Sequence, residues 1–517
     1  MPHSLNPTTN YINPSSLGTT DNMAQDIEEM ASFCKKKGFV FPSAEIYGGI
    51  AGFYDYGPLG TELKNNLIAA LWKRFVQQRD DVAGIDGSII THASVWKASG
   101  HVDCFEDVMV ECPKCKQRMR ADHLVEEKLK ISVEGVDAAG LNKLITDNKI
   151  GCPQCKSPLT EAKKFNLMFD VNVGPVKGNT SYLRPETAQL IFTNFKLVAE
   201  TSRLKLPFGI AQVGKAFRNE ISPRDFLFRT REFEQFEIEF FVHPDRIDDC
   251  EMLKENNSLM MNAKLEKEEC QMTVSEAVKK KLMSAWHAYW ISSFYRLFLE
   301  FGIPPESLRI RQHHKDELAH YARACFDIEY KFPFGWKEIH GCADRKNFDI
   351  TQHSLHSKKD LSFFDEETKQ RVVPDVIEPS QGIGRAFLAL LFNAYNDDKE
   401  RENVVLKLAP ELAPVKAAVF PLLSNNDEQG TMAKGIVAEL RKDHVVKYDR
   451  SGSIGRRYAR NDEIGTPYCI TVDFDSLTKK DVTIRDRDTT SQKRVKRAAL
   501  ADTLRKLLNK ELAFKDL

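Results

Sequence analysis

The sequence predicts an α+β fold with antiparallel strands and helical stretches, followed by a separate C-terminal α/β domain. Residues 212–220 and 233–241 alternate in character, as the two strands of an antiparallel hairpin do. Helical patterns of apolar residues accompany this hairpin. After residue 410, short apolar strands and helices alternate, which is typical of a compact α/β domain.

The chain length and composition predict several parts. The 517 residues are enough for two to four domains. Residues 1–22 are rich in Ser, Thr, Asn and Pro, and predict a disordered tail. A first domain spans 23–409, with insertions at about 112–164 and at about 244–329, the latter expected to be helical. Residues 410–517 form the C-terminal domain.

Charge and cysteine content exclude some classes of protein. Lys plus Arg equals Asp plus Glu at 74 each, so net charge gives no sign of nucleic-acid binding, although a local basic surface stays possible. No apolar run of about 18 residues exists, so no membrane span is expected. The eleven cysteines are mostly scattered, which fits a reducing compartment. We therefore expect a cytoplasmic protein.

The first strong pattern lies in the stretch "GPLGTELKNNLIAALWKRFV". Apolar residues recur every four positions, which predicts a helix with one apolar stripe, and Pro58 stands near its start. The stripe is Leu59, Leu63, Leu67, Leu71 and Phe75. Either it packs in the core of its own chain or it contacts a second copy, and the pattern alone leaves both open.

The hairpin places charged residues beside small ones. Gln212, Gly214, Ala216, Arg218 and Glu220 share one face if the first strand continues that far. On the second strand Gln235, Glu237 and Glu239 share a face. This face is either an exposed surface with weak salt bridges or a binding surface, in which the small residues leave room for a flat ligand and the arginine grips a phosphate or carboxylate.

Further stretches carry the same chemistry. "VIEPSQGIGR" leads from a strand with Glu378 and Ser380 into an apolar helix that Arg385 opens, a place that favours anions. "LRPETAQ" carries Glu186, and "GWKEIHG" places Glu338 and His340 on one face of a strand. Several carboxylates and arginines together suit an ammonium group, a nucleotide and a divalent metal.

Two cysteine pairs stand apart from the other cysteines. "CPKC" and "CPQC" hold Cys112, Cys115, Cys152 and Cys155, with a helical insert between the pairs. Such spacing predicts a structural zinc ion held by four thiolates, and the alternative is four free thiols. The histidines of "RQHH", His313 and His314, are assigned no role.

The C-terminal pattern predicts strands at 417–423, 445–448, 468–474 and 482–486, with helices between them and a final helix. From residue 410 onward there are 21 Lys and Arg against 16 Asp and Glu, and the excess is concentrated in "KRVKRAALADTLRK". This basic helix indicates either a contact with a polyanion or an ordinary solvated surface.

Six stretches, in order along the chain, resemble one family. They are "EIYGGIAGFYDYGPLGTELKNN", "LRPETAQ", "FRNEISPRD", "REFEQFEIEFF", "VIEPSQGIGR" and "IGRRYARNDEIGTPYCITVDF". They resemble the homodimeric glycyl-tRNA synthetases, which are class II aminoacyl-tRNA synthetases, from about residue 23 to the C-terminus. The resemblance implies an antiparallel sheet flanked by helices, an anticodon-binding C-terminal domain, and a dimer built on the helix that follows Gly57.

The resemblance also implies roles for single residues. Arg218 and Arg385 would be catalytic and would neutralise the phosphates of ATP. The ATP-binding residues would be Arg218, Asn219, Glu220, Phe228, Arg229, Phe233, Glu338, Ile339, Glu378 and Arg385. Glycine would be held by Arg120, Glu186, Glu237, Glu378 and Ser380. Glu338 would bind the Mg²⁺ that accompanies ATP.

The implied activity is the ATP-dependent joining of glycine to the 3′ end of tRNA(Gly) through glycyl-adenylate, by a homodimer that does not bind membranes. Two alternatives stay open. The chain could be a class II ligase for another small amino acid, or an inactive synthetase-like protein that binds RNA. The presence of Arg218, Glu220, Glu338, Glu378 and Arg385 argues against an inactive protein.

Overall fold

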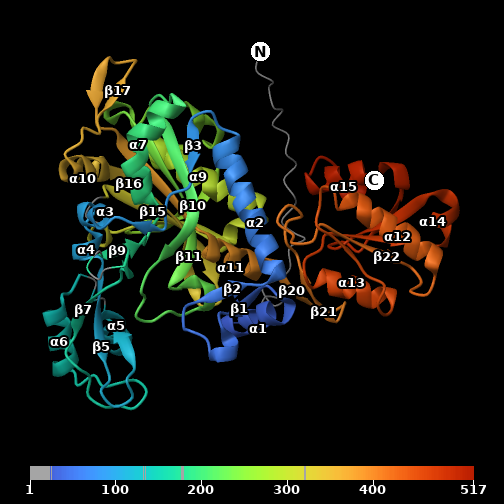
Figure 1. The fold of residues 1–517 in the computed structure, drawn as a ribbon, viewed down its shortest axis with the longest axis horizontal. Helices are drawn as coiled ribbons and strands as arrows, with labels where there is room; N and C mark the ends of the chain where they lie inside the picture. The colour runs from blue at the N-terminus through green and yellow to red at the C-terminus, as the bar shows by residue number, and fades with distance from the viewer. Residues whose placement is uncertain are drawn as a thin grey trace.

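The structure, a computed structural model, describes residues 24, 26–131, 133, 135–175, 178, 180–318 and 322–517. The tail predicted at residues 1–22 lies outside the described residues. A large N-terminal body, a lobe that projects from it and a C-terminal domain make up the molecule (Figure 1). None of the helices in the described ranges has the length and apolar character needed to cross a bilayer.

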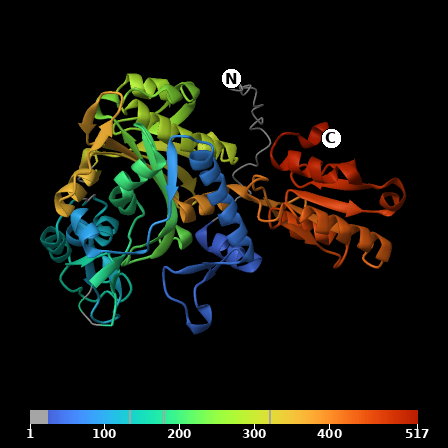
Figure 2. The same ribbon diagram turned by 45° about the horizontal axis from the view of Figure 1, so that its top comes forward.

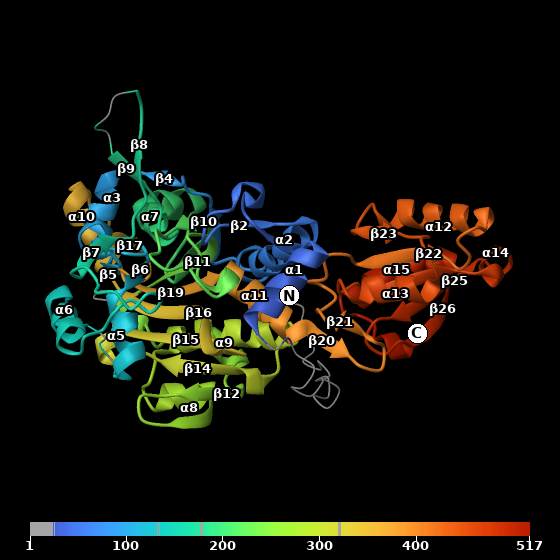
Figure 3. The same cartoon turned by 90° about the horizontal axis from the view of Figure 1, so that it is seen from below.

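A nine-stranded sheet organises the N-terminal body, and Figure 3 shows its strands side by side. All neighbouring strands are antiparallel except the pairs β3–β10 and β12–β14. The order across the sheet is β13 (Glu269–Thr273), β12 (Met260–Lys264), β14 (Leu308–Gln312), β15 (Ala324–Phe332), β16 (Gly335–Lys346), β19 (Asp375–Gly382), β11 (Glu232–Val242), β10 (Phe208–Phe217) and β3 (Val82–Ile85). The predicted antiparallel sheet is confirmed.

Helices cover the back face of this sheet. Phe236 and Phe240 of β11 point to that face, where they contact the rings of α9 (Ala285–Glu300) and of α2 (Pro58–Trp72) with the turn that follows it. Pro58 stands at the first position of α2, where its missing N–H costs nothing. The whole stripe from Leu59 to Phe75 is buried in the core of its own chain. The core alternative for this stripe is therefore confirmed.

The front face is covered only in part. Helix α7 (Ala188–Ser202) packs its phenylalanines on Phe208 and Phe241, at the end of the hairpin far from its loop. Helix α10 (Phe348–Ser357) lies beside α7. Helix α11 (Ile383–Ala394) begins where β19 ends but packs on α2, and with α1 (Ile27–Lys37) it belongs to the core at the back of the sheet. Much of the front face beyond α7 is left for the site.

The stretch 244–329 was predicted to be helical, and this prediction is only partly right: the aromatic helix is present as α9, but the stretch also contains strands. It supplies β12, β13, β14 and most of β15 to the main sheet, beside α9 and the short helix α8 (Val274–Lys279). The β12 and β13 strands have only five residues each, with Met261, Ala263 and Met272 buried between more exposed neighbours. An alternation of buried and exposed residues over only five positions is a weak signal of a strand. The long aromatic pattern of α9 in the same stretch is a much stronger signal of a helix.

The first insertion folds as a lobe with its own core, visible at the lower left of Figure 1. A three-stranded sheet and two helices build it. They are β5 (Glu106–Glu111), β6 (Arg118–Arg120), α5 (Ala121–Leu129), α6 (Ala138–Asp147) and β7 (Lys163–Asn166). The lobe thus begins slightly before residue 112 and ends slightly after residue 164.

Short elements complete the body. They are β1 (Val40–Pro42), β2 (Tyr54–Tyr56), β4 (Ile90–Thr91), α3 (Ala93–Ala98), α4 (His101–Cys104), β8 (Asp170–Asn172), β9 (Thr180–Leu183), β17 (Phe363–Asp365), β18 (Gln370–Val372), β20 (Tyr395–Asp398) and β21 (Asn403–Leu406).

The C-terminal domain stands beside the body and has a separate core (Figure 2). Its five strands are ordered β23-β22-β24-β25-β26. The elements are β22 (Ala417–Pro421), α12 (Asp427–Leu440), β23 (Val446–Tyr448), α13 (Ile454–Asp462), β24 (Tyr468–Val472), α14 (Phe474–Lys479), β25 (Asp481–Asp486), β26 (Gln492–Lys496) and α15 (Leu500–Leu508). The predicted α/β alternation is confirmed.

One C-terminal element differs from its prediction. The basic run that starts at Lys493 was expected in the final helix, but Gln492–Lys496 forms the edge strand β26 and α15 starts only at Leu500. Val495 is buried and its neighbours are exposed or partly exposed, which is the alternation of an edge strand with one apolar contact. Half of the positive charges of this run, at Lys493, Arg494 and Lys496, therefore lie along a sheet edge.

Candidate functional site

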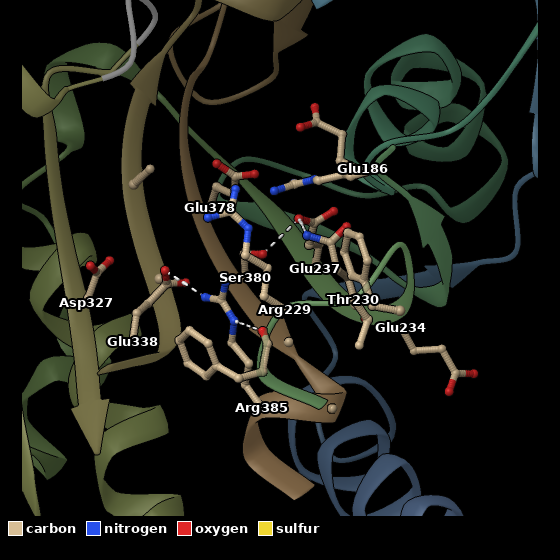
Figure 4. Close-up of a pocket in the computed structure, with 18 of the residues that line it drawn as sticks. Glu186, Arg229, Thr230, Glu234, Glu237, Asp327, Glu338, Glu378, Ser380 and Arg385 are labelled. Carbon is tan, nitrogen blue, oxygen red and sulfur yellow. Dashed lines mark hydrogen bonds and ion pairs between the residues drawn. The ribbon is translucent and has the colours of Figure 1, made fainter. Parts of the chain in front are cut away.

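A pocket of about 290 Å³ opens on the front face, where β11, β16 and β19 meet the start of α11 (Figure 4). Its wall holds most of the residues predicted to act. These are Glu186, Arg218, Glu220, Phe228, Arg229, Phe233, Glu237, Glu338, Glu378, Ser380 and Arg385. Residues that lie far apart in the sequence are thus brought to one cavity.

Three carboxylates converge at one end of the pocket. Glu186 precedes α7, Glu237 lies on β11 and Glu378 lies on the adjacent β19, and each residue is less than 10% exposed. Figure 4 shows Glu186 above Glu237 in the view and Glu378 to the left of both. The predicted convergence of these three side chains is therefore present in the fold.

Glu237 is held by donors on all sides. One oxygen accepts hydrogen bonds from the main-chain N–H of Thr187 at 2.9 Å and from the Thr187 hydroxyl. The other accepts from Ser380 Oγ at 2.8 Å and from Gln235 Nε2 at 2.9 Å. Burial and the charge of Glu186 nevertheless raise the pKa of Glu237. The four hydrogen bonds fix its carboxylate in position.

Glu186 and Glu378 differ in charge state although they are neighbours. Burial raises the pKa of Glu378 to about 8, with Glu237 and Glu186 acting in the same sense and Arg345 opposing them. Burial acts on Glu186 as well, but His101, at 3.2 Å, together with Arg345 and Gln189, holds its pKa well below the ordinary value. The end of the pocket is therefore acidic, and one of its acids titrates near neutral pH.

Arginines and aromatic rings build the other end. The Arg218 guanidinium lies 5.2 Å from the centre of the Phe233 ring, and its Nε donates to the Pro185 carbonyl at 3.1 Å. Arg385, in the first turn of α11, pairs with Glu338 at 2.8 Å and lies over the Phe228 ring. Each guanidinium keeps part of its surface in the pocket, where it can receive an anion.

Glu220 and Arg229 face each other across the loop of the hairpin. Arg229 Nε donates to the Glu220 carboxylate at 2.7 Å, and Glu220 is buried. The hairpin itself pairs Gln212 with Glu237 and Ala216 with Phe233, as its alternation predicted. However, β10 ends at Phe217, so Arg218 and Glu220 project from the loop rather than from the strand.

Gly214 was predicted to leave room for a flat ligand, but it has a different structural role. A side chain at Gly214 would meet Arg184 Nη2 at 2.2 Å, because the buried Arg184 guanidinium fills the space above it. Arg184 donates to the main-chain carbonyls of Lys215 at 2.6 Å and Gly87 at 2.7 Å. The room beside Gly214 therefore holds a structural arginine and is not room for a ligand.

Glu338 and His340 do not share a face, contrary to the prediction. Ile328 pairs with His340 and Glu329 with Glu338, so β16 carries one extra residue, Ile339, in a β-bulge. His340 is fully buried and stacks on Phe294 of α9 at the back of the sheet. The Ile339 side chain is also buried in the main core, so its predicted place in the pocket is not supported.

Two more predicted residues lie outside the pocket wall. Arg120, at the end of β6, is paired with Asp107 at 2.9 Å and with Asp122, which occupy its guanidinium. The Asn219 main-chain N–H donates to the Leu167 carbonyl at 2.8 Å, and its side chain does not line the cavity. Arg120 is nevertheless close to the site, because Arg229 approaches the same Asp107 carboxylate at 3.7 Å.

The pocket also contains residues that the sequence did not single out. His313, Cys325 and Asp327 line its nucleotide-side wall, the part near Glu338, and His313 Nε2 lies 2.7 Å from Asp327 Oδ2. The signal was present in "ACFDIEY", where Cys325, Asp327 and Glu329 alternate with apolar residues on β15. Behind the carboxylates stand Arg345 and Asp349, which no motif indicated.

The four paired cysteines come together at the tip of the lobe. Cys112 Sγ lies 3.4 Å from Cys155 Sγ, and Cys115 Sγ lies 3.5 Å from Cys152 Sγ. All four sulfurs are within 4.8 Å of one another. A tetrahedral zinc ion with Zn–S bonds of about 2.3 Å needs sulfurs roughly 3.8 Å apart, so the four sulfurs fit this ion.

Comparisons with known proteins agree with this geometry. The tRNA synthetase class II core domain (G, H, P, S and T) matches residues 175–395, and the anticodon binding domain matches residues 416–507. A prolyl-tRNA synthetase structure from Cryptosporidium parvum has a TM-score of 0.55 at 14% identity, covering 95% of this chain and 80% of that one. This likeness supports the fold.

Curated relatives are closer in sequence. A glycine–tRNA ligase from Geobacillus thermodenitrificans is 45% identical over 505 residues, which is 96% of this chain and 99% of that protein. Another, from Caldanaerobacter subterraneus subsp. tengcongensis, is 45% identical over 498 residues, with 94% and 99% coverage. With this identity over nearly the full length of both chains, the chain belongs to the glycine–tRNA ligase family of class II aminoacyl-tRNA synthetases.

Proposed function

We propose that this chain activates glycine with ATP and transfers it to tRNA(Gly) in the pocket of the front face. The observation that carries this proposal is the convergence of Glu186, Glu237 and Glu378 at one end of a cavity whose other end holds Arg218 and Arg385. A compact ammonium group is strongly favoured among three buried carboxylates, and phosphates are favoured beside the arginines.

The first step joins the glycine carboxylate to the α-phosphorus of ATP and releases pyrophosphate. With the ammonium of glycine held by the three carboxylates, its carboxylate points toward Arg218, which also holds the α-phosphate. Adenine lies against Phe233 with its amino group at Glu220, and Arg385 meets the outer phosphates. No side chain acts as a nucleophile, so the rate comes from alignment and from neutralising the charge that develops.

The carboxylates of Glu338 and Asp327 line the nucleotide side of the pocket and offer the oxygen ligands that Mg²⁺ prefers. They would hold the Mg²⁺ that accompanies ATP, which supplies further neutralisation of phosphate charge. In the second step the terminal ribose hydroxyl of tRNA attacks the glycyl carbonyl, and AMP leaves. The C-terminal domain, which we place at residues 410–517, would bind the anticodon, a role supported by its match to the anticodon binding domain.

Discrimination against larger amino acids follows from lack of space. Ser380 donates its hydroxyl hydrogen to Glu237 and stands where a side chain on the substrate would begin. Alanine would need room for a methyl group between these fixed side chains, and a clash rejects a larger substrate far more strongly than a roomy pocket rejects a smaller one.

ATP–pyrophosphate exchange measured with each amino acid separately tests the proposal. We expect exchange with glycine and a rate at least about a hundred-fold lower with alanine or serine, since steric rejection is strong. Faster exchange with alanine or serine would instead indicate a ligase for another small amino acid. A purified, folded chain that shows no exchange with any amino acid would point to an inactive RNA-binding protein.

Glycine binding should depend on pH through Glu378. Below pH 8 this carboxyl carries a proton, because burial raises its pKa to about 8, and that proton must leave before the carboxylate can accept from the ammonium group. The KM for glycine should therefore fall as pH rises from 6.5 to 8 and level off above. The groups that face Glu378 are Glu237 and Glu239 on β11, Glu186 and Arg345.

Steady-state exchange at a series of pH values measures this dependence. In Glu378→Gln the KM for glycine should be high at every pH and should lose the step near pH 8. A KM for glycine that is flat from pH 6.5 to 8.5 in the unaltered protein would contradict the role of Glu378.

We further propose that the lobe holds one structural zinc ion through its four paired cysteines. Metal analysis of the purified protein should give about one zinc per chain, and Cys152→Ser should lose it, because a missing thiolate leaves an incomplete tetrahedron. The matched control is Cys104→Ser, which removes an exposed thiol outside the cluster and should keep the zinc. Four freely reactive thiols in metal-free, folded protein would refute the site.

A homodimer is also proposed, although α2 uses its leucine stripe for its own core. Exposed apolar side chains gather instead on the short loop between β1 and β2, where Ile46, Tyr47 and Ile50 are 88%, 87% and 64% exposed. Such a group of side chains gains most by being covered, and a second copy is the partner that the family resemblance implies. Sedimentation of the unaltered protein tests the proposed dimer.

A further inference from the structure

Four buried acids crowd the glycine end of the pocket, which poses an electrostatic problem. Besides Glu186, Glu237 and Glu378, Glu239 of β11 is fully buried beneath them. Neither carboxyl oxygen of Glu239 has a hydrogen-bond partner among the described residues. Buried charges of one sign repel one another strongly, so something must keep the site acidic and its shape fixed.

Arg345 is the buried cation that faces this cluster. It lies near the end of β16, is 1% exposed, and donates from Nη1 to Glu378 Oε1 at 2.8 Å. The rest of its fork is bound to Asp349 in α10, with Nε at 2.8 Å from one oxygen and Nη2 at 2.9 Å from the other. The guanidinium also lies over the Phe192 ring of α7, so its plane is fixed.

Gln189 continues this set of contacts to the second carboxylate. Its Nε2 donates to Asp349 Oδ1 at 2.8 Å and to Glu186 Oε1 at 2.9 Å. Its own oxygen lies 2.7 Å from His353 Nε2, which fixes which end of the amide faces the acids. An unbroken series of hydrogen bonds thus runs from Glu378 through Arg345, Asp349 and Gln189 to Glu186.

This series joins parts of the chain that are far apart. Glu378 lies on β19, Arg345 on β16, Asp349 on α10, and Gln189 in the first turn of α7, three residues after Glu186. None of the three linking side chains lines the pocket. Whatever they contribute to substrate binding must therefore act through the two carboxylates at the ends of the series.

We propose that Arg345 is a positioning residue for glycine recognition, which with Asp349 and Gln189 holds Glu186 and Glu378 at a fixed separation around the substrate ammonium. Arg345 also supplies a buried positive charge that acts on Glu186, Glu239 and Glu378 together. This inference rests on the proposed function, since it concerns how the same pocket recognises glycine. The proposal predicts that ATP binding does not depend on Arg345.

Arginine and lysine are not equivalent at position 345, because a guanidinium is a planar group with several donors and an ammonium is a compact charge. Arg345 satisfies Glu378 and both oxygens of Asp349 at once, and a lysine can reach only some of these acceptors although it keeps the charge. Methionine fills similar space with neither charge nor donors. A comparison of arginine, lysine and methionine at position 345 therefore separates the effect of hydrogen-bond geometry on the KM for glycine from the effect of charge.

The test compares Arg345→Lys, Arg345→Met and Gln189→Met in ATP–pyrophosphate exchange, with KM for glycine, KM for ATP and Tm measured for each full-length protein. We expect the KM for glycine to rise about ten-fold in Arg345→Lys and at least a hundred-fold in Arg345→Met. Gln189→Met, which cuts the series at its other end, should raise it about ten-fold. The KM for ATP should stay within two-fold in all three.

Arg309→Lys is the matched control, because Arg309 is a largely buried arginine of the same sheet that pairs with Glu329 at 2.6 Å and does not line the pocket. It should lower Tm slightly and leave both KM values unchanged. A purely structural role for Arg345 would lower Tm with no change in KM, or raise both KM values together, and either result overturns the proposal. If Arg345→Met does not fold, Arg345→Lys and Gln189→Met still decide.

Exchange measured on the unaltered protein distinguishes a failure of the proposed function from a failure of the positioning role of Arg345. If it shows no glycine-dependent exchange, the proposed function fails first and the positioning role fails with it. If it exchanges normally and the three variants keep its KM for glycine, only the positioning role is refuted.

Discussion

Arg218→Ala is expected to lower the rate of ATP–pyrophosphate exchange by about a thousand-fold while the protein stays folded. Arg218 is the guanidinium placed to contact both the substrate carboxylate and the α-phosphate, between which the new bond forms. Removing one preorganised donor from such a position typically costs a factor of roughly 10² to 10³, and here a full charge is removed as well. Steady-state exchange with saturating glycine and ATP measures the loss.

Folding should survive this change because Arg218 contributes little to the core. Its side chain is partly exposed, donates a hydrogen bond to the Pro185 carbonyl, and otherwise contacts the rings of Phe105 and Phe233. We expect Tm to change by no more than about 3 °C. Arg224→Ala, in the same loop but exposed, is the matched control and should keep most of the activity. Normal exchange in Arg218→Ala would remove Arg218 from the mechanism.

Glu186→Gln is expected to raise the KM for glycine about a hundred-fold and to leave the KM for ATP nearly unchanged. The change removes one negative charge that faces the substrate ammonium and keeps the shape of the side chain. Losing one partner of a buried, charge-assisted hydrogen bond costs about 2 to 5 kcal/mol, and a hundred-fold effect corresponds to about 2.7 kcal/mol. Exchange kinetics at varied glycine and varied ATP measure the two constants.

The contacts of Glu186 make this variant a clean probe. The amide oxygen of glutamine can still accept from Gln189, and the new amide nitrogen can face His101, which lies 3.2 Å from Glu186 Oε2. Glu366→Gln provides a matched change at an exposed ion pair with Lys205 and should alter neither constant. An unchanged KM for glycine in Glu186→Gln would show that the ammonium group binds elsewhere.

The sequence predicted the sheet, the hairpin and most of the pocket wall because these depend on local patterns. Alternation along β10 and β11 reports directly which side chains share a face, so the place of Glu237 was accessible. The strand and helix patterns also indicated Arg218, Glu378 and Arg385 as candidates, and the family resemblance supplied their individual roles.

What escaped prediction depends on contacts between distant segments. The purpose of Gly214 became visible only with Arg184 above it, and the bulge at Ile339 has no local signature, since one extra residue in a strand looks like ordinary sequence. Arg345 and Asp349 carry no motif because their importance lies in what they contact. The roles of such residues depend on contacts between distant segments, and a single sequence does not show these contacts.

The bulge has a consequence for how this strand can diverge over evolutionary time. Because Ile339 is the surplus residue, it sets which way the next residues of β16 face, Gly341 among them, as far as the second irregularity of the register at Arg345. Point substitutions along the strand leave that orientation intact. The loss or gain of one residue there would instead move the side chains that follow to the opposite face of the sheet. The length of this segment is therefore under tighter selection than its composition.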